Sequence, residues 1–264
     1  MNYLSKHGEA KNSELLPLIG DFSLMTLHRD LNKLEEDGLI MRVHGGCIFA
    51  PLVQSRQELA FSYRINQNTM EKDEIARIAV DFIQPDRAYY FDAGSTVLSM
   101  SQLMNDEHHA IITSAPNIAV ELSRSGSNTV TLLGGQVNNP TLSCSGPQSE
   151  RMLETINIDV AVMATSGYSP RTGFSSGCMS ESELKARVIQ KSSLTVMLMD
   201  HTKISKNYPF TFAHMEDIDI LVVDELSDDL KAAAEAAHVL VFSPDDGRRS
   251  DERMELFDHL LDKN

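Results

Sequence analysis

Between residues 69 and 243, strand-sized apolar runs alternate with segments of helical periodicity, and no other feature constrains the fold as much. The segment 69–82 shows the helical pattern, because Ile75, Ile78 and Phe82 share one face. Such alternation is typical of a largely parallel sheet with helices on both faces, in which ligands bind at the carboxyl ends of the strands. Strands are predicted at 88–91, 109–112, 129–133, 160–164, 194–199, 218–223 and 239–242, and further helices at 96–104, 117–122, 181–190 and 230–237.

The first 50 residues differ in character and predict short helices followed by a β-hairpin edge. Ser23 is the predicted N-cap of a helix at 24–37, which Gly38 would end. A strand-like run follows and stops at Gly45 and Gly46. This order outlines a winged helix-turn-helix domain. The predicted α/β protein therefore has four parts, a winged helix-turn-helix at 1–50, a connector at 51–68, an α/β domain at 69–243 and a C-terminal helical extension at 244–264.

The predicted helix at 24–37 has two contrasting faces. One narrow stripe holds four leucines and predicts the buried face, namely Leu24, Leu27, Leu31 and Leu34. The opposite face carries an apolar tip, a hydroxyl, a guanidinium and an ammonium, from Met25, Thr26, Arg29 and Lys33. Groups of these kinds read base edges and hold phosphates in a DNA major groove. A solvated helix face is the alternative, but the surrounding layout favours DNA binding.

The segment 22–31, Leu34 and the run 39–46 together resemble the DeoR/GlpR family of bacterial transcriptional regulators. The family pattern is Ser-x-x-Thr-Ile-Arg-Arg-Asp-Leu, then a Leu three residues later and a wing that ends Arg-x-His-Gly-Gly-Ala. The resemblance implies that the helix at 24–37 is the recognition helix and that the run 39–46 is part of the wing. The expected DNA-binding residues are Ser23, Met25, Thr26, His28, Arg29, Lys33, Arg42 and His44.

Three departures from the family pattern concern this DNA-binding domain. His28 stands where the family has the first of two arginines, and its charge depends on pH. Pro17 lies inside the helix before the turn, which it should kink or shorten. The family also has about ten more residues ahead of the position that matches Met1, so the domain is expected to be shortened at its N-terminus.

Nearly all of residues 60–243 resemble the effector domain of the same family. The resemblance implies a fold similar to ribose-5-phosphate isomerase and a sensor of phosphorylated sugars or related metabolites, with no cofactor. The matching motifs occur in family order at 64–72, 92–96, 113–114, 134–135, 159–167, 181–185 and 200–203.

The segment 92–96 indicates an anion site without reference to the family. Gly94 permits close backbone approach, while Ser95 and Thr96 offer hydroxyls and N–H groups at a helix N-terminus. The alternative is that Ser95 only caps its helix. Lys203, at the end of another strand, adds a positive charge and favours the anion site.

The remaining effector residues have structural alternatives of their own. Glu181 and Lys185 are spaced i, i+4, so a helix-surface pair also explains them. Gly134 and Gly135 fit either a tight turn or the floor of a pocket. The expected effector-binding residues are Asp92, Gly94, Ser95, Thr96, Thr113, Ser114, Gly134, Gly135, Glu181, Lys185 and Lys203.

Composition restricts the remaining function classes. With 23 Lys and Arg against 38 Asp and Glu, the net charge of −15 argues against a protein that coats nucleic acid without specificity. The three cysteines are far apart in the sequence, which predicts neither a disulfide framework nor a zinc site, and no other metal site is expected. Because no signal peptide or membrane span is evident, a cytoplasmic protein is expected.

The sequence thus predicts a transcriptional regulator that is not an enzyme. We expect a repressor of carbohydrate uptake or catabolism genes that binds a double-stranded DNA operator as a homodimer or homotetramer, under control of a small phosphorylated metabolite. One alternative is an isomerase-like enzyme, since the site would hold residue types that transfer protons beside a phosphate, namely Asp92, Glu181, Lys185 and Lys203. Another is a sensor that has lost independent DNA binding, as His28 and Pro17 allow.

Overall fold

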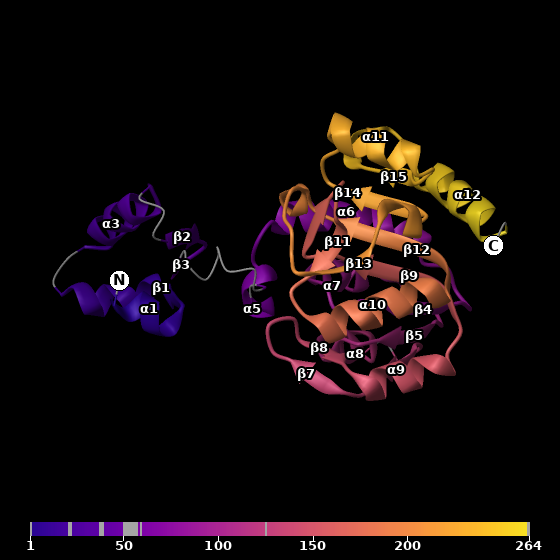
Figure 1. Cartoon of the computed structure of the whole chain (residues 1–264), viewed down its shortest axis with the longest axis horizontal. Coiled ribbons are helices and arrows are strands. Elements are labelled where there is room, and N and C mark those ends of the chain that lie inside the picture. Colours follow the sequence, from indigo (N-terminus) through magenta and orange to yellow (C-terminus); the bar gives the residue numbers. More distant parts are fainter. Residues whose placement is uncertain are drawn as a thin grey trace. The chain divides into compact units, whose positions relative to one another are not determined.

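In the computed structural model, the chain divides into two compact units, residues 1–59 and 60–264 (Figure 1). The structure describes residues 2–20, 23–36, 40–49, 58, 60–124 and 126–262. Gly38, the expected end of the recognition helix, and most of the expected connector lie outside these residues. Each unit is described by itself.

The first unit combines short helices with a three-stranded antiparallel sheet. Pro17 falls in the first turn of a 3-10 segment, so the preceding helix is only four residues long, as its position predicted. The sheet has the order β1-β3-β2, with strands β1 (Glu9–Lys11), β2 (Ile40–Val43) and β3 (Gly46–Phe49). The helical segments are α1 (Asn2–His7), α2 (Asn12–Leu15), η1 (Leu16–Ile19) and α3 (Leu24–Glu36).

The core of the first unit confirms part of the predicted leucine stripe and corrects the rest. Leu27 and Leu31 of α3 are buried, and Leu34 is half-buried and packs against the same cluster. Leu24 was expected beside them but is 51% exposed, because the first turn of α3 extends past the small core. The cluster also receives Leu4 from α1, which keeps that short helix attached.

The second unit is built on a seven-stranded parallel sheet, which confirms the predicted α/β fold (Figure 1). Successive side chains point to opposite faces, so Tyr89 and Phe91 join one core cluster and Tyr90 joins the other. In spatial order the strands are β15 (Leu240–Phe242), β14 (Ile220–Val223), β12 (Ser192–Met199), β9 (Ile158–Ala164), β4 (Ala88–Phe91), β5 (Ala110–Thr113) and β6 (Thr129–Leu132).

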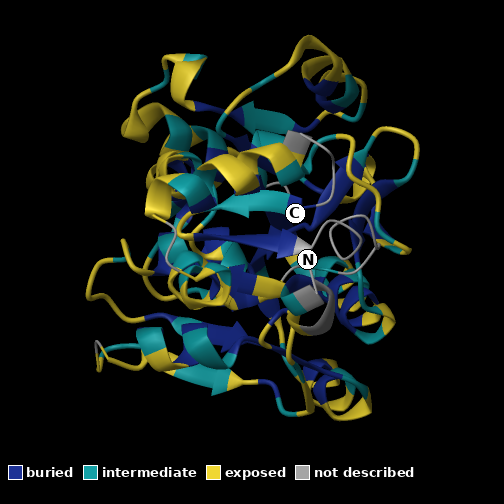
Figure 2. Cartoon of the chain, turned by 90° about the vertical axis from the view of Figure 1, so that its left-hand side faces the viewer, coloured by how far each residue is buried: buried dark blue, intermediate teal, exposed yellow. Residues whose placement is uncertain are grey.

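Helices cover both faces of this sheet and bury its strands, as the dark strands in Figure 2 show. The face of Tyr89 is covered by α6 (Thr69–Ala79), η2 (Val80–Phe82), α7 (Ser95–Ser101), α8 (Pro116–Leu122) and α12 (Ser250–Leu261). The face of Tyr90 is covered by α9 (Pro147–Glu154), α10 (Met179–Lys191) and α11 (Asp228–Ala236).

Two segments that the sequence assigned elsewhere belong to this unit. Residues 60–68 were counted with the connector, yet they hold α5 (Phe61–Arg64), and Phe61 is buried in the core. The predicted C-terminal helix forms as α12 and also belongs to the unit, because Phe257 lies fully buried against Phe82.

Short strands and 3-10 turns complete the unit, several of them in segments for which the sequence predicted no element. The strands form a hairpin of β7 (Gln136–Asn138) and β8 (Ser143–Ser145) and a small sheet of β10 (Gly167–Ser169), β11 (Gly173–Ser176) and β13 (Phe210–Ala213). The turns are η3 (His201–Lys203), η4 (Met215–Asp217) and η5 (Pro244–Asp246).

Candidate functional site

The carboxyl ends of the central strands bring together residues from distant parts of the chain. Asp92 follows β4, Thr113 ends β5, Ala164 ends β9 and Asp200 follows β12. Because these parallel strands are neighbours in the sheet, their ends form one continuous edge, where ligands bind in folds of this type.

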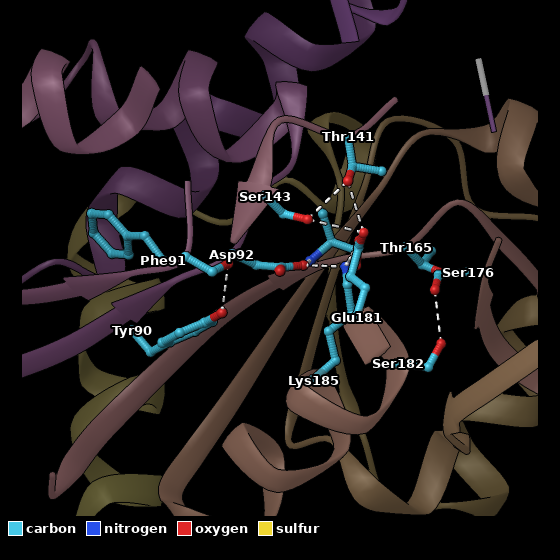
Figure 3. A network of polar contacts seen from close by, with 12 residues as sticks. Tyr90, Phe91, Asp92, Thr141, Ser143, Thr165, Ser176, Glu181, Ser182 and Lys185 are labelled. Atoms are coloured by element: carbon cyan, nitrogen blue, oxygen red, sulfur yellow. Dashed lines mark hydrogen bonds and ion pairs between the residues drawn. The ribbon is translucent and has the colours of Figure 1, made fainter. Parts of the chain in front are cut away.

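A buried ion-pair network lies at the centre of this edge (Figure 3). The Lys185 Nζ lies 2.5 Å from Asp92 Oδ2 and 3.5 Å from Glu181 Oε1, and it donates a hydrogen bond of 2.9 Å to the Ala164 carbonyl. The Ala164 N–H donates to the same Asp92 oxygen at 3.0 Å. Glu181 and Lys185 are therefore no surface pair, since their side chains are 5% and 4% exposed.

The second carboxylate oxygen of Glu181 is held by the β7–β8 hairpin. It accepts hydrogen bonds from Thr141 Oγ1 at 2.8 Å, Ser143 Oγ at 3.1 Å and Asn138 Nδ2 at 3.3 Å. The hairpin thus covers the buried network, with its hydroxyls pointing toward Glu181 (Figure 3). These three residues were not predicted from the sequence, although the hydroxyl-rich run from Thr141 to Ser145 was a visible signal.

The segment 92–96 forms a tight turn that requires a glycine. A Cβ on Gly94 would lie 2.5 Å from the Cβ of Ala164, so a larger residue would push the turn away from β9. Gly94 is the N-cap of α7, and no side chain caps that helix, so the capping role weighed for Ser95 is wrong. Ser95 and Thr96 are buried at the start of the helix.

The other hydroxyls and glycines of the predicted set serve the scaffold in this structure. Thr113 Oγ1 donates to the Phe91 carbonyl at 2.6 Å and accepts from the Ala115 N–H at 3.0 Å. Ser114 Oγ accepts a hydrogen bond from the Tyr90 hydroxyl at 2.9 Å.

Gly134 and Gly135 stand where the chain approaches the β7–β8 hairpin closely. Gly135 has a φ of +151°, and a Cβ there would lie 2.5 Å from the Ser145 carbonyl oxygen. The Gly134 carbonyl accepts from Ser149 Oγ at 2.5 Å. Close backbone packing explains Gly135, whereas a Cβ on Gly134 would meet only Met152 Sδ, at an ordinary 3.7 Å.

A second polar cluster surrounds Asp200 at the end of β12. Lys203 Nζ lies 3.7 Å from Asp200 Oδ2, and Asn68 Nδ2 donates to Asp200 Oδ1 at 3.2 Å and to Thr202 Oγ1 at 2.9 Å. Burial alone would raise the pKa of Asp200, but Lys203, the Thr202 hydrogen bonds and Lys72 together hold it below its usual value.

Lys72 and Arg64 bring further positive charge to this cluster. Lys72 is buried and donates to the Arg64 and Gln67 carbonyls, and burial together with the charge of Lys203 lowers its pKa to about 8. The Nε and Nη2 atoms of Arg64 are buried without a hydrogen-bond partner. Arg64, Asn68 and Lys72 belong to the family motif, but the expected effector-binding set omitted them.

In the first unit, the predicted DNA-binding residues surround the start and the exposed side of α3. Ser23 Oγ accepts from the Thr26 N–H at 3.3 Å, which confirms Ser23 as a helix cap. Met25, Arg29 and Lys33 are exposed, and Thr26 is half-buried beside Ser23.

Two of the predicted DNA-binding residues make contacts inside the unit. His28 is half-buried, with its Nε2 atom 3.3 Å from Asn12 Nδ2. Arg42 on β2 donates to Asn32 Oδ1 at 2.5 Å and to the His28 carbonyl at 3.3 Å, so it holds the wing against α3. His44 is exposed in the β2–β3 turn.

Other kinds of site find no support in the residues that the structure describes. These residues contain no cluster of three His, Cys, Asp or Glu side chains suited to a metal ion. Nor does any helix among them have the length and apolar character to cross a membrane. A cavity of about 390 Å³ beside α11, lined by Tyr168, His214 and Ala233 among others, contains none of the expected site residues.

Comparison with known proteins matches both units. Residues 1–51 match the DeoR-like helix-turn-helix domain, and residues 67–225 match the DeoR C-terminal sensor domain. The regulator GolR of Listeria innocua is 31% identical over 79% of this chain and 82% of its own length. The regulator GlpR of Haloferax volcanii is 29% identical over 83% of this chain and 86% of its own, and the repressor GlcR of Bacillus subtilis is 27% identical over 86% of each.

A solved D-ribose-5-phosphate isomerase is similar to 50% of this chain over 52% of its own length, with 15% identity and a TM-score of 0.37. The two family models and the curated relatives nevertheless identify a regulator, so the expectation that the chain is not an enzyme is confirmed and the isomerase alternative is wrong.

Proposed function

Because this chain belongs to the DeoR family of helix-turn-helix transcriptional regulators, we propose that it represses genes of carbohydrate uptake or catabolism in the cytoplasm. It binds a double-stranded DNA operator as a homodimer or homotetramer, and a phosphorylated sugar or related metabolite releases it. The role as a repressor is supported by relatives named as repressors, GlcR of Bacillus subtilis and AccR of Agrobacterium fabrum.

The observation that carries the DNA-binding role is the exposed face of α3. Arg29 and Lys33 are exposed one and two turns after Met25, and the Ser23 cap leaves the start of the helix at the surface. Such a helix enters the major groove with its first residues at the base edges. Arg42 acts by holding the wing against α3, while His44 at the tip of the wing is free to approach a phosphate or the minor groove.

The effector site that we propose spans the two polar clusters at the carboxyl end of the sheet. The Lys185 charge is already matched by Asp92 and Glu181, so this network is suited to sugar hydroxyls rather than to a second anion. Positive charge for a phosphate comes from Lys203 and from Arg64, whose Nε and Nη2 atoms have no hydrogen-bond partner. Ser95 and Thr96, at the start of α7 after β4, supply hydroxyls and N–H groups at the same edge of the sheet.

Control by the metabolite follows from linkage between metabolite binding and the equilibrium between the DNA-competent and DNA-incompetent states of the protein. The metabolite shifts the population away from the DNA-competent state only as far as its affinities for the two states differ. Asn68, which follows α5, donates hydrogen bonds to Asp200 and Thr202, so the proposed site contacts the first residues of the second unit.

The test is a binding titration of the full chain against the DNA upstream of its own gene and neighbouring operon. Specific binding should weaken with salt by about 0.9 log units per log unit of salt for each phosphate contact. A panel of sugar phosphates is then screened for release of the bound DNA, with the parent sugars as controls. If scrambled DNA binds as tightly as the upstream DNA, the proposed repressor role is wrong, and if no sugar phosphate changes binding, the proposed effector class is wrong.

A further inference from the structure

The first turn of α3 exposes two neighbouring apolar side chains. The Ser23 cap makes Leu24 and Met25 the first two residues of the helix, and their exposed fractions are 51% and 83%. The next leucine, Leu27, is 3% exposed and fixes the helix to the core. The two exposed side chains therefore project from a helix that Leu27 fixes to the core, and they contribute little to the stability of the unit.

Positive charge follows Met25 along the exposed side of the helix. Arg29 lies one turn later, with its side chain 78% exposed, and Lys33 lies a further turn on. The exposed side of α3 thus has an apolar start and a cationic continuation. This order matches a DNA major groove, where base edges lie at the floor and phosphates line the rim.

Exposure alone does not distinguish Met25 from other methionines. Met70 is 75% exposed and is likewise the second residue of a helix, α6. Met25 differs because exposed cations continue its face and because its helix is the recognition helix of the proposed DNA-binding unit. Met70 has the acidic neighbours Glu71 and Asp73 instead and lies in the second unit.

We propose that Met25 reads the 5-methyl group of a thymine in the operator. The inference rests on the proposed function and deepens it by naming the chemical group that is read. In the major groove only an A·T pair presents this methyl group, and apolar side chains recognise it by excluding water. Contacts from Arg29 and Lys33 then supply affinity and position rather than this element of sequence choice.

The expected effect follows from the size of one methyl group. Burying it should improve affinity about fourfold, which corresponds to about 0.8 kcal/mol. For an operator with two equivalent half-sites, affinity should fall about sixteenfold when both methyl groups are removed.

The experiment uses the full chain and the segment of upstream DNA that it protects in a footprint. Each thymine of that segment is replaced in turn by deoxyuridine, which removes only the 5-methyl group. The affinity of wild type should fall about fourfold when one particular thymine in either half-site is replaced. Met25→Ala should bind more weakly to the natural segment and show no further loss at that thymine, whereas Met70→Ala, the matched control, should behave as wild type.

Two results would overturn the inference while leaving the repressor role intact. One is specific binding in which every deoxyuridine replacement changes affinity less than about twofold. The other is a Met25→Ala variant that binds specifically and keeps the full sensitivity of wild type to deoxyuridine. If wild type binds the upstream DNA no better than scrambled DNA, the proposed function fails, and this inference fails with it.

Discussion

Replacing Lys185 with Met should strongly destabilise the second unit. The substitution keeps much of the side-chain volume but removes the ammonium that lies 2.5 Å from Asp92 and 3.5 Å from Glu181. Both carboxylates are buried, so each loses its counter-charge where little water is available to replace it. Removing one partner of a buried ion pair costs about 3–5 kcal/mol of unfolding free energy. For a domain of about 200 residues, the melting temperature should fall by about 6–20 °C.

Tyrosine fluorescence during urea unfolding gives a selective measurement of this loss. The chain has no tryptophan, and five of its six tyrosines lie in the second unit, with Tyr3 alone in the first. The signal therefore reports mainly on the unit that holds the ion-pair network. Lys231→Met is the matched control, because Lys231 is exposed on α11 and its replacement should change the unfolding free energy by less than about 0.5 kcal/mol.

A double variant separates the lost charge from the lost packing. In Asp92→Asn/Lys185→Met the amide still accepts the hydrogen bond from the Ala164 N–H, and one uncompensated charge is gone. The double variant should regain more than half of the stability lost by Lys185→Met alone. If its loss equals or exceeds that of the single variant, the argument from uncompensated charge is wrong.

Three further outcomes follow from the second unit. Gly94→Ala should lower the unfolding free energy by about 1–3 kcal/mol in urea, because its Cβ would lie 2.5 Å from the Ala164 Cβ, and an unchanged value would contradict the close approach. Phe257→Ala should cost about 3–5 kcal/mol, since the ring is fully buried, and a loss below about 1 kcal/mol would mean that α12 is an appendage. The hydrogen bond to Asp224 raises the pKa of His201. The stability that this interaction contributes is therefore complete below the unfolded-state pKa of 6.5 and is lost as pH rises through the folded-state pKa. An NMR titration of His201 should show this higher pKa in wild type and a lower one in Asp224→Asn, and equal values would exclude Asp224 as the cause.

The central strands of the second unit were predictable from the sequence because they depend on local hydrophobic pattern. Apolar runs such as 160–164 and 194–199 formed the central strands β9 and β12, since buried parallel strands are apolar on both faces. The hairpin β7–β8 and helix α9 were missed. The hairpin strands are three residues long and serine-rich, and α9 has few apolar residues to mark a helical period.

Asp92, Glu181 and Lys185 were singled out from the sequence, but the way they meet was not predictable, and the hairpin residues that hold Glu181 were missed. The spacing of Glu181 and Lys185 fits both a surface pair and a buried pair, and only Asp92, 93 residues away from Lys185 in sequence, decides between them. The hydrogen bonds of Asn68 to Asp200 and Thr202 likewise cross more than 130 residues. Leu24 was predicted to be buried but is exposed, because a helical stripe does not reveal where the core beneath it ends.

The sheet order has a consequence for how the sensor forms during folding. Strand β9 lies between β4 and β12, so the Asp92–Lys185 contact closes only after the middle of the chain has been inserted beside β4. Contacts of such long sequence separation require closure of a long loop, which costs chain entropy and slows folding. A truncated chain that ends before α10 has the turn at Gly94 but lacks the lysine that neutralises Asp92. The proposed effector site is thus complete only once α10 has joined the ends of β4 and β9.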